Sequence, residues 1–159
     1  MRILGIDPGL RFTGWGVVDF DGGRFSHAAN GTIKVPVSLS LAERLAFIHK
    51  ALRRVVEEFK PQAAAIEEPF VNINPASTLK LGAARGVALA VPALFGVPVA
   101  EFSPNLIKKS VAGVGHARKE QIEMMVGVLL AKPKIDSEHA ADALAIAIAR
   151  AYNRPMPKT

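Results

Sequence analysis

Cysteine is missing from this sequence of 159 residues. Its absence excludes disulfide bonds, thiolate zinc sites and cysteine nucleophiles, and it suits a reducing compartment. Long hydrophobic runs are missing as well: the longest, at residues 86–99, is interrupted by Pro92 and Pro98 and is too short to span a bilayer. An apolar run near the N-terminus is broken by Asp7, which does not suit a secretory signal. We therefore expect a cytoplasmic protein that does not associate with membranes.

The chain also lacks internal repeats, low-complexity segments and long linkers. Hydrophobic residues make up 50% of it and charged residues 21%, which is typical of a globular domain. A chain of this length can form a hydrophobic core without disulfides. We predict one domain at residues 1–152, followed by a flexible basic tail at residues 153–159.

The charge balance is basic. The formal net charge is +6 and the isoelectric point is near 9.9. Such a balance favours a polyanionic partner, because each phosphate that is neutralised releases counterions. A basic protein without such a partner is an equally good interpretation of charge alone.

The first part of the chain has the pattern of strands. Residues 2–6 form a buried apolar run, and residues 13–20 are rich in β-branched and aromatic side chains. Residues 24–35 predict a third strand, broken at Asn30 and Gly31. Three consecutive strands with a tight turn between the second and third indicate an antiparallel meander.

The rest of the chain alternates helical and strand patterns. Ser40 and Glu43 form a capping-box signature, and hydrophobic residues then recur at helical spacing until Pro61. Because strands separated by helices pair in parallel through right-handed crossovers, we predict a mixed α/β fold with five strands and helices on both faces. The later strands are expected at residues 63–66 and 97–102, and the later helices at residues 74–95, 105–111, 119–131 and 137–152.

Two predicted strands end in carboxylates. Asp7 follows the first strand and Glu67 the fourth. Ligands of α/β sheets gather at the carboxyl ends of strands, and a partly buried carboxylate needs a cation, hydrogen bonds or a proton. Taken alone, an Asp-Pro-Gly sequence such as that at Asp7 is more often a turn than a catalytic site, and Glu67 is ambiguous beside Glu68.

A histidine and an aspartate share one face of the last predicted helix. His139 and Asp142 are three residues apart, and the face continues toward apolar residues. Acids also favour the first turn of a helix, which explains Glu138 better than Asp142. Together, Asp7, Glu67 and Asp142 would suit hard divalent cations, and two such metals about 4 Å apart would activate water to attack a phosphodiester. A phosphate-binding P-loop and a convincing nucleophile triad are both absent from the sequence.

Several motifs resemble the bacterial Holliday-junction resolvases of the RuvC type. They are Gly-Ile-Asp-Pro-Gly at residues 5–9, Thr-Gly-Trp-Gly at 13–16, Ile-Glu-Glu-Pro-Phe at 66–70, the Leu79-Lys80-Leu81-Gly82 run that continues to 88, and the alanine-rich run at 140–147. The similarity extends in order over residues 2–151. It implies a ribonuclease-H-like fold and a homodimer that cuts four-way DNA junctions with Mg²⁺ or Mn²⁺, with two ions expected per site.

The resemblance also implies the site residues. Asp7, Glu67 and Asp142 match three of the family's four acidic catalytic positions, and the fourth falls on His139, where many relatives have aspartate. Our hypothesis is that His139 is a metal ligand or a proton-transfer residue, since a neutral imidazole can do either.

Six further residues are candidates for DNA contact. Phe70 matches an aromatic residue that stacks at the junction centre, although core packing would explain it equally well. Lys108 and Lys119 match lysines that support binding and catalysis in the family. Phosphate contacts are also expected from the nearby cations Lys109, Arg118 and Arg85.

The resemblance implies partners as well. The small residues between positions 74 and 95 are the candidate dimer interface, and a branch-migration helicase of the RuvA/RuvB type is the expected partner complex. The main alternative is a RuvC-like nuclease that processes structured RNA such as pre-ribosomal RNA. An actin-like ATPase domain and a non-catalytic junction-binding module are the alternatives from other classes.

Overall fold

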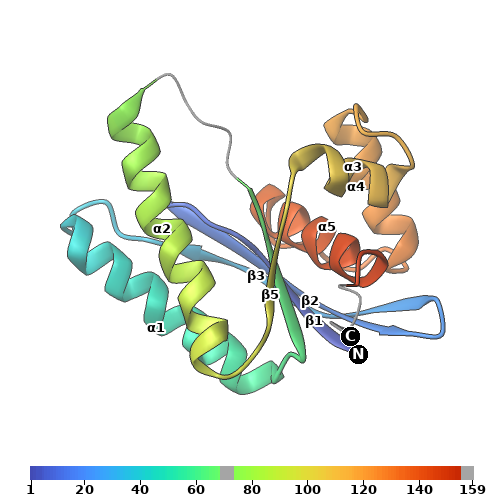
Figure 1. Ribbon diagram of the computed structural model, residues 1–159, viewed down its shortest axis with the longest axis horizontal. Coiled ribbons are helices and arrows are strands. Elements are labelled where there is room, and N and C mark those ends of the chain that lie inside the picture. The colour runs from blue at the N-terminus through green and yellow to red at the C-terminus, as the bar shows by residue number, and fades with distance from the viewer. Residues whose placement is uncertain (69–73, 155–159) are drawn as a thin grey trace, which may run out of the picture.

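The computed structural model describes residues 1–68 and 74–154. Their elements follow the predicted order of three strands, then alternating helices and strands, then helices (Figure 1). The strands are β1 (Arg2–Asp7), β2 (Phe12–Asp21), β3 (Arg24–Lys34), β4 (Ala63–Glu67) and β5 (Val99–Phe102). The helices are α1 (Leu41–Phe59), α2 (Pro75–Leu94), α3 (Pro104–Ala112), α4 (Lys119–Leu129) and α5 (Glu138–Tyr152).

The five strands form one mixed sheet in the order β3-β2-β1-β4-β5. β2 is antiparallel to both β1 and β3, whereas β4 is parallel to β1 and to β5. The predicted meander followed by parallel strands is therefore confirmed. The parallel pairing brings the carboxyl ends of β1 and β4 to the same edge of the sheet, side by side.

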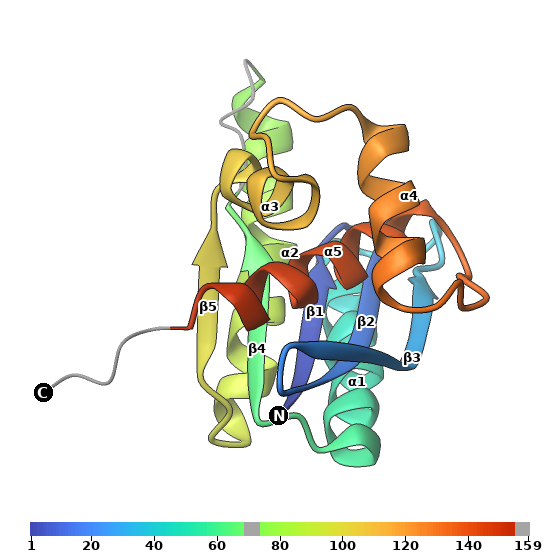
Figure 2. The ribbon, with the colours of Figure 1, turned by 90° about the vertical axis from the view of Figure 1, so that its right-hand side faces the viewer.

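Helices cover both faces of the sheet, as predicted. α1 and α2 pack on one face, and α5 crosses the other face with α3 and α4 beyond it (Figures 1 and 2). Each face has its own core: Leu4 and Ile6 point toward α1 and α2, whereas Ile3 points toward α5. β1 and β4 are buried on both faces, which explains why their sequences are continuous apolar runs and do not alternate.

The ends of α1 follow from its sequence. The Ser40 side chain accepts a hydrogen bond from the Glu43 amide, and the Glu43 carboxylate accepts one from the Ser40 amide. This confirms the predicted capping box. The helix ends at Lys60, which takes a left-handed conformation before Pro61.

Glycines let α5 lie unusually close to the sheet. A Cβ atom added to Gly5 in β1 would stand 1.9 Å from the Ala143 carbonyl oxygen, and one added to Gly14 in β2 would stand 2.0 Å from the His139 carbonyl oxygen. No side chain fits at either position. The glycines of the sheet thus fix the depth at which the N-terminal turns of α5 pack against β1 and β2.

Two boundaries differ from the predictions. β3 runs unbroken through Asn30 and Gly31, because Gly31 leaves room for the Trp15 ring of the neighbouring strand. α4 ends at Leu129, before the predicted end at residue 131. Ala131 and Lys132 take left-handed conformations, which do not continue a right-handed helix.

In the part of the chain that the structure describes, no helix combines the length and hydrophobicity needed to cross a membrane. α5 ends at Tyr152, and most of the predicted tail, residues 155–159, lies outside the described residues.

Candidate active site

Two of the predicted carboxylates lie side by side at the edge of the sheet. Ile6 of β1 pairs with Ile66 of β4, so that Asp7 and Glu67 are the next residues of two adjacent parallel strands. Both strands are buried, whereas Asp7 and Glu67 at their ends are half-buried. The predicted convergence of these two side chains follows directly from the strand register.

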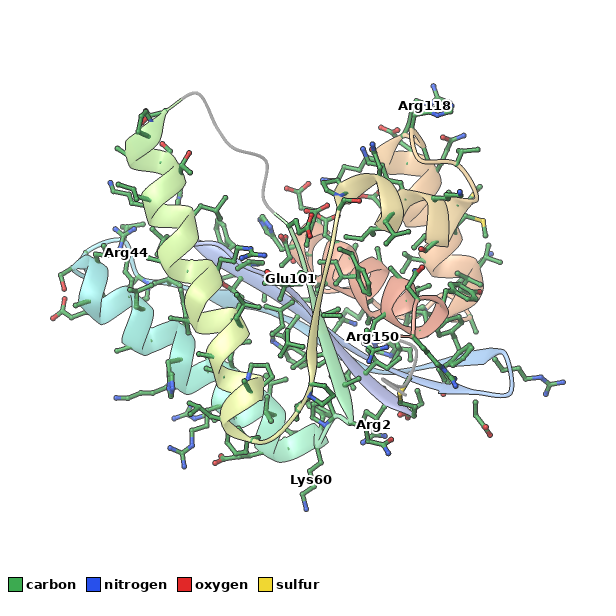
Figure 3. The ribbon with its side chains drawn as sticks, viewed as in Figure 1. Arg2, Arg44, Lys60, Glu101, Arg118 and Arg150 are labelled. Carbon is green, nitrogen blue, oxygen red and sulfur yellow. The ribbon has the colours of Figure 1, made fainter. Side chains whose placement is uncertain are left out.

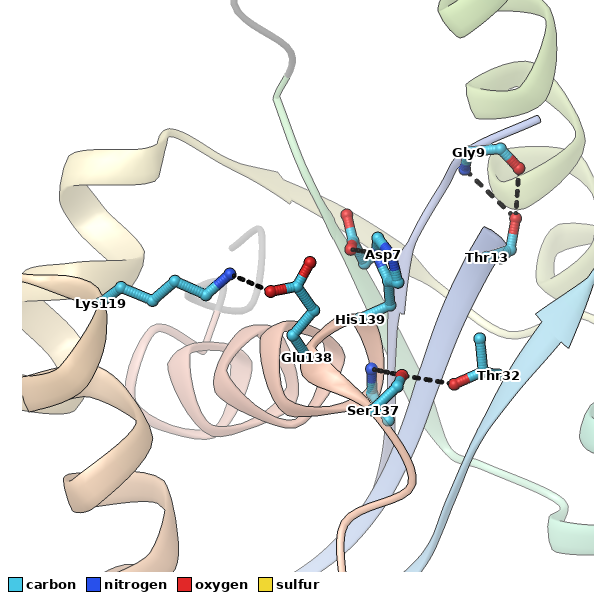
Figure 4. A network of polar contacts seen from close by, with 9 residues as sticks. Asp7, Gly9, Thr13, Thr32, Lys119, Ser137, Glu138 and His139 are labelled. Carbon is cyan, nitrogen blue, oxygen red and sulfur yellow. Dashed lines mark hydrogen bonds and ion pairs between the residues drawn. The ribbon is translucent and has the colours of Figure 1, made fainter. Parts of the chain in front are cut away.

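The third carboxylate is Asp142 of α5, the helix that crosses one face of the sheet. Ser137 caps the helix by accepting a hydrogen bond from the Ala140 amide, and its hydroxyl also contacts Thr32 of β3 (Figure 4). The loop before Ser137 is held by Asn30, which accepts from the Asp136 amide and donates to the Lys134 carbonyl oxygen, both at 2.9 Å. The first turns of α5, with His139 and Asp142, are therefore fixed to β3.

The three carboxylates influence one another electrostatically. Burial, followed by the charge of Asp142, raises the pKa of Asp7 to about 6. Burial, followed by the charges of Asp7 and Asp142, raises the pKa of Glu67 to about 7. The pKa of Asp142 is also raised, chiefly by burial, against the opposing charges of Lys119 and His139. Buried like charges of this kind need a neutralising partner, either protons or cations.

A cavity of about 280 Å³ opens beside these groups. Glu67 and Asp142 contribute carboxylates to its wall, and Lys108 of α3 and Lys119 of α4 contribute amines. The rest of the lining is apolar and consists of Pro104, Ile107, Ile122, Ala145 and Ile146. A cleft lined by both acids and cations suits a phosphodiester, because the cations can bind the phosphate near the acids.

Lys119 is held by an acid that the sequence analysis did not assign to the site. The Nζ atom of Lys119 lies 2.9 Å from Oε2 of Glu138 (Figure 4). The positive charge of Lys119 also opposes part of the rise in the pKa values of Asp7 and Asp142. The first-turn position of Glu138 suggested only a helix-dipole contact. Its pairing with Lys119 depends on how α4 packs against α5, for which the sequence carries no local signal.

His139 lies between Asp7 and an aromatic ring. Its Nδ1 is 3.4 Å from Oδ2 of Asp7 (Figure 4). Its ring stacks on Phe12, with a distance of 5.3 Å between ring centroids and an interplanar angle of 16°. Phe12 is a second residue that the sequence analysis missed, since it lies 127 positions from His139 and outside the motifs.

The donor chemistry of the site fits divalent metal ions. Three carboxylates are ligands of the kind that Mg²⁺ and Mn²⁺ prefer, and the raised pKa values of Asp7 and Glu67 indicate a place where a cation would be stabilised. Within residues 1–68 and 74–154, no three such side chains already stand at the mutual distances of a metal site.

The remaining predicted contacts are dispersed. Arg118 and Lys109 are exposed on the lobe of α3 and α4, and Arg118 projects from its tip (Figure 3). Arg85 of α2 forms an ion pair with Glu101 of β5, which must open before Arg85 reaches a phosphate. Phe70 lies outside the described residues.

The similarity to known proteins covers almost the whole chain. The sequence profile of the family described as crossover junction endodeoxyribonuclease RuvC matches residues 3–150. A protein of that description from Xanthobacter autotrophicus is 55% identical over 154 residues, which cover 97% of this chain and 91% of the relative.

Two solved structures agree with this similarity. The structure of Thermus thermophilus RuvC superposes with a TM-score of 0.87 at 35% identity and covers 96% of this chain and 94% of that chain. Thermus thermophilus RuvC in complex with a Holliday junction substrate gives a TM-score of 0.89 at 35% identity, with 96% and 93% covered.

Proposed function

The chain belongs to the RuvC family of crossover junction endodeoxyribonucleases, and from this premise we propose that Asp7, Glu67, His139 and Asp142 are its catalytic centre. As a member of the family it hydrolyses DNA phosphodiester bonds and resolves Holliday junctions in recombination and repair. The observation that supports this site best is the gathering of three carboxylates with raised pKa values beside a cavity that carries Lys108 and Lys119.

Nucleases of this family depend on divalent metal ions, and we infer two ions of Mg²⁺ or Mn²⁺ per site. Asp7, Glu67 and Asp142 would hold them through carboxylate oxygens, with an imidazole nitrogen of His139 as a further ligand or as a proton carrier. When bound, such ions lower the pKa of water and stabilise the charge that develops on the phosphate.

The protein's own cations position the DNA. Lys108 of α3 and Lys119 of α4 both line the cavity, and their ammonium groups would bind the oxygens of the scissile phosphate. Glu138 holds Lys119 in place through the 2.9 Å contact. Lys109 and Arg118, exposed on the same lobe, would contact the flanking backbone of one junction arm. These are positions from which a charge adds affinity but no sequence selectivity.

The same family membership supports a homodimer. The exposed side of α2 carries mostly small and apolar residues beside the polar Ser77 and the charged Lys80, with Leu79 and Leu94 exposed by 75% and 72%. Among the described residues, a Cβ atom added to Gly82 or Gly86 would meet nothing within 4 Å, so a second helix can approach closely there. A two-fold axis through α2 would give two equivalent active sites, as paired nicks on opposite strands of a symmetric junction require.

Three further expectations rest on the family alone. They are cooperation with a branch-migration helicase of the RuvA/RuvB type, action in the cytoplasm and stacking of Phe70 at the junction centre. The other substrate considered, structured RNA, finds no support in these similarities, because the family is named for DNA cleavage and a solved relative holds a Holliday junction.

The test is cleavage of a synthetic four-way junction in Mg²⁺ or Mn²⁺, beside a linear duplex of the same sequence and a folded RNA. We expect ligatable nicks at symmetric positions in the junction and little cleavage of the other two substrates. Equal cleavage of the duplex, or preferential cleavage of the RNA, would contradict the proposed function.

A further inference from the structure

The His139 imidazole is restrained on two sides by residues from different strands. Asp7 at the end of β1 faces its Nδ1 atom at 3.4 Å. Phe12 at the start of β2 stacks on its ring face, with 5.3 Å between centroids and only 16° between the ring planes. In the described part of the chain, Nε2 makes no hydrogen bond. The two contacts leave the Nε2 edge as the one available to a ligand or a substrate.

The contact with Asp7 is too weak to fix this orientation by itself. A distance of 3.4 Å lies at the long end of the hydrogen-bond range, and His139 stays one-third exposed. The torsion that rotates an imidazole has broad, roughly two-fold minima, so a flipped or tilted ring costs little without a second restraint. The stacked ring of Phe12 is such a restraint, since it excludes tilted rotamers over the whole face of the imidazole.

Phe12 is itself held firmly. It begins β2 and pairs with Lys34 of β3, and the amide of Val35 donates to the Arg11 carbonyl oxygen at 2.9 Å. The turn that precedes it is closed by Thr13, whose hydroxyl donates to the Gly9 carbonyl oxygen at 2.8 Å. The Arg11 guanidinium lies 5.7 Å from the centroid of the Phe12 ring. A ring carried by paired strands can define the orientation of a group that packs against it.

We propose that Phe12 is a positioning residue that fixes the ring plane of His139, so that Nδ1 faces Asp7 and Nε2 is left for a ligand or a substrate. The proposal rests on the proposed function and deepens it, because it gives the site a residue outside the acidic set. Phe12 acts through His139 and does not touch the phosphate. It is 36% exposed, which also permits direct stacking on a DNA base, and the experiments below separate the two roles.

The first experiment observes the ring directly, by NMR of histidine side chains in the metal-free protein without DNA. The stack predicts that the carbon-bound protons of His139 are shifted upfield by the ring current of Phe12. Phe12→Leu should abolish this shift, whereas Phe12→Tyr should keep it. The matched control is Phe25→Ala, which removes an aromatic contact with Phe20 far from the site. This result does not depend on nuclease activity, so it can fail or succeed separately from the proposed function.

The second experiment combines substitutions at both positions. Phe12→Leu should lower the single-turnover rate of junction cleavage by about tenfold and leave the dissociation constant for the junction unchanged within about twofold. Phe12→Tyr should restore most of the rate. In a His139→Ala background, Phe12→Leu should have almost no further effect, because the group that it positions is gone.

Three outcomes would overturn the proposal. An unshifted His139 spectrum in the wild-type protein would show that the rings do not stack. A weakened junction affinity in Phe12→Leu would assign Phe12 to DNA binding. A full tenfold loss in the His139→Ala background would show that Phe12 acts independently of His139.

Discussion

At the scale of single residues, the candidate site disfavours the ionised forms of its carboxylic acids. Asp7 and Glu67 have pKa values of about 6 and about 7, above the ordinary 3.8 and 4.5, because burial and neighbouring carboxylates disfavour the ionised forms. In the unfolded chain these groups ionise near their ordinary values. The folded protein therefore holds more protons than the unfolded chain between about pH 4 and pH 7. Its stability must fall as the pH rises through this range.

Asp7→Asn should for this reason stabilise the metal-free protein at high pH. The variant cannot ionise, so in EDTA at pH 8 its free energy of unfolding should exceed that of the wild type by about 1 to 3 kcal/mol. At about pH 2.5, below both the ordinary and the raised pKa, Asp7 is largely protonated in the folded and the unfolded chain, so the difference should become small. Urea unfolding at both pH values measures it, with the exposed Asp21→Asn as control. A variant that is less stable than the wild type at pH 8 would contradict the raised pKa.

Individual residues also mark the limit of prediction from sequence. Asp7, Glu67 and Asp142 were identified because each belongs to a motif or ends a recognisable strand. The contacts that orient them were not, because they join distant residues: Thr32 and Ser137 are 105 positions apart, and Asp7 and His139 are 132 apart. No local pattern encodes such pairs.

At the scale of elements, the seating of α5 on the sheet sets the geometry of the site. α5 carries His139 and Asp142, and glycines at the matching positions of β1 and β2 let its backbone approach closely. The strand and helix periods were sufficient to predict this helix and its apolar face. They could not predict its depth, because that depends on which glycines lie beneath it once the sheet has formed.

Gly14→Ala should damage the site through this contact. Its new methyl group would stand 2.0 Å from the His139 carbonyl oxygen, so the first turn of α5 must move away. We expect a loss of about 1 to 3 kcal/mol in the free energy of unfolding and a larger proportional loss of junction cleavage than of junction binding. Denaturant unfolding and single-turnover cleavage measure the two effects.

Gly127→Ala is the matched control for that substitution. Gly127 lies in α4, and an added Cβ atom there meets nothing within 4 Å. The change should be neutral or should stabilise the helix by up to about 1 kcal/mol. If Gly14→Ala behaved as Gly127→Ala does, α5 would not be seated on the sheet as described.

At the scale of the whole molecule, we assign separate functions to two surfaces. The cleft between the sheet edge and the lobe of α3 and α4 carries the carboxylates and lysines. The exposed side of α2, on the opposite face of the sheet, carries the small and apolar residues that we assign to the dimer (Figure 1). The sequence predicted the sheet and its helices, because these depend on pattern and composition. The pairing of Arg85 with Glu101 shows what it could not predict, since α2 and β5 meet only in the folded chain.

Gly86→Arg should separate dimerisation from folding. The exposed glycine lies midway along α2, and a long charged side chain there would block the approach of a second helix. Light scattering should give twice the 16.9 kDa of one chain for the wild type and the mass of one chain for the variant. Gly127→Arg, at a comparably open glycine of α4, should remain dimeric. A dimeric Gly86→Arg protein would place the interface elsewhere.

The central claim is that the three carboxylates are needed to cleave the junction, whereas the cations of the protein bind it. Asp142→Asn tests it most directly, with binding and single-turnover cleavage measured on the same synthetic four-way junction. We predict that binding in EDTA stays within about threefold of the wild type, whereas cleavage in Mg²⁺ or Mn²⁺ falls by about a hundredfold or more. Cleavage close to the wild-type rate would contradict the account.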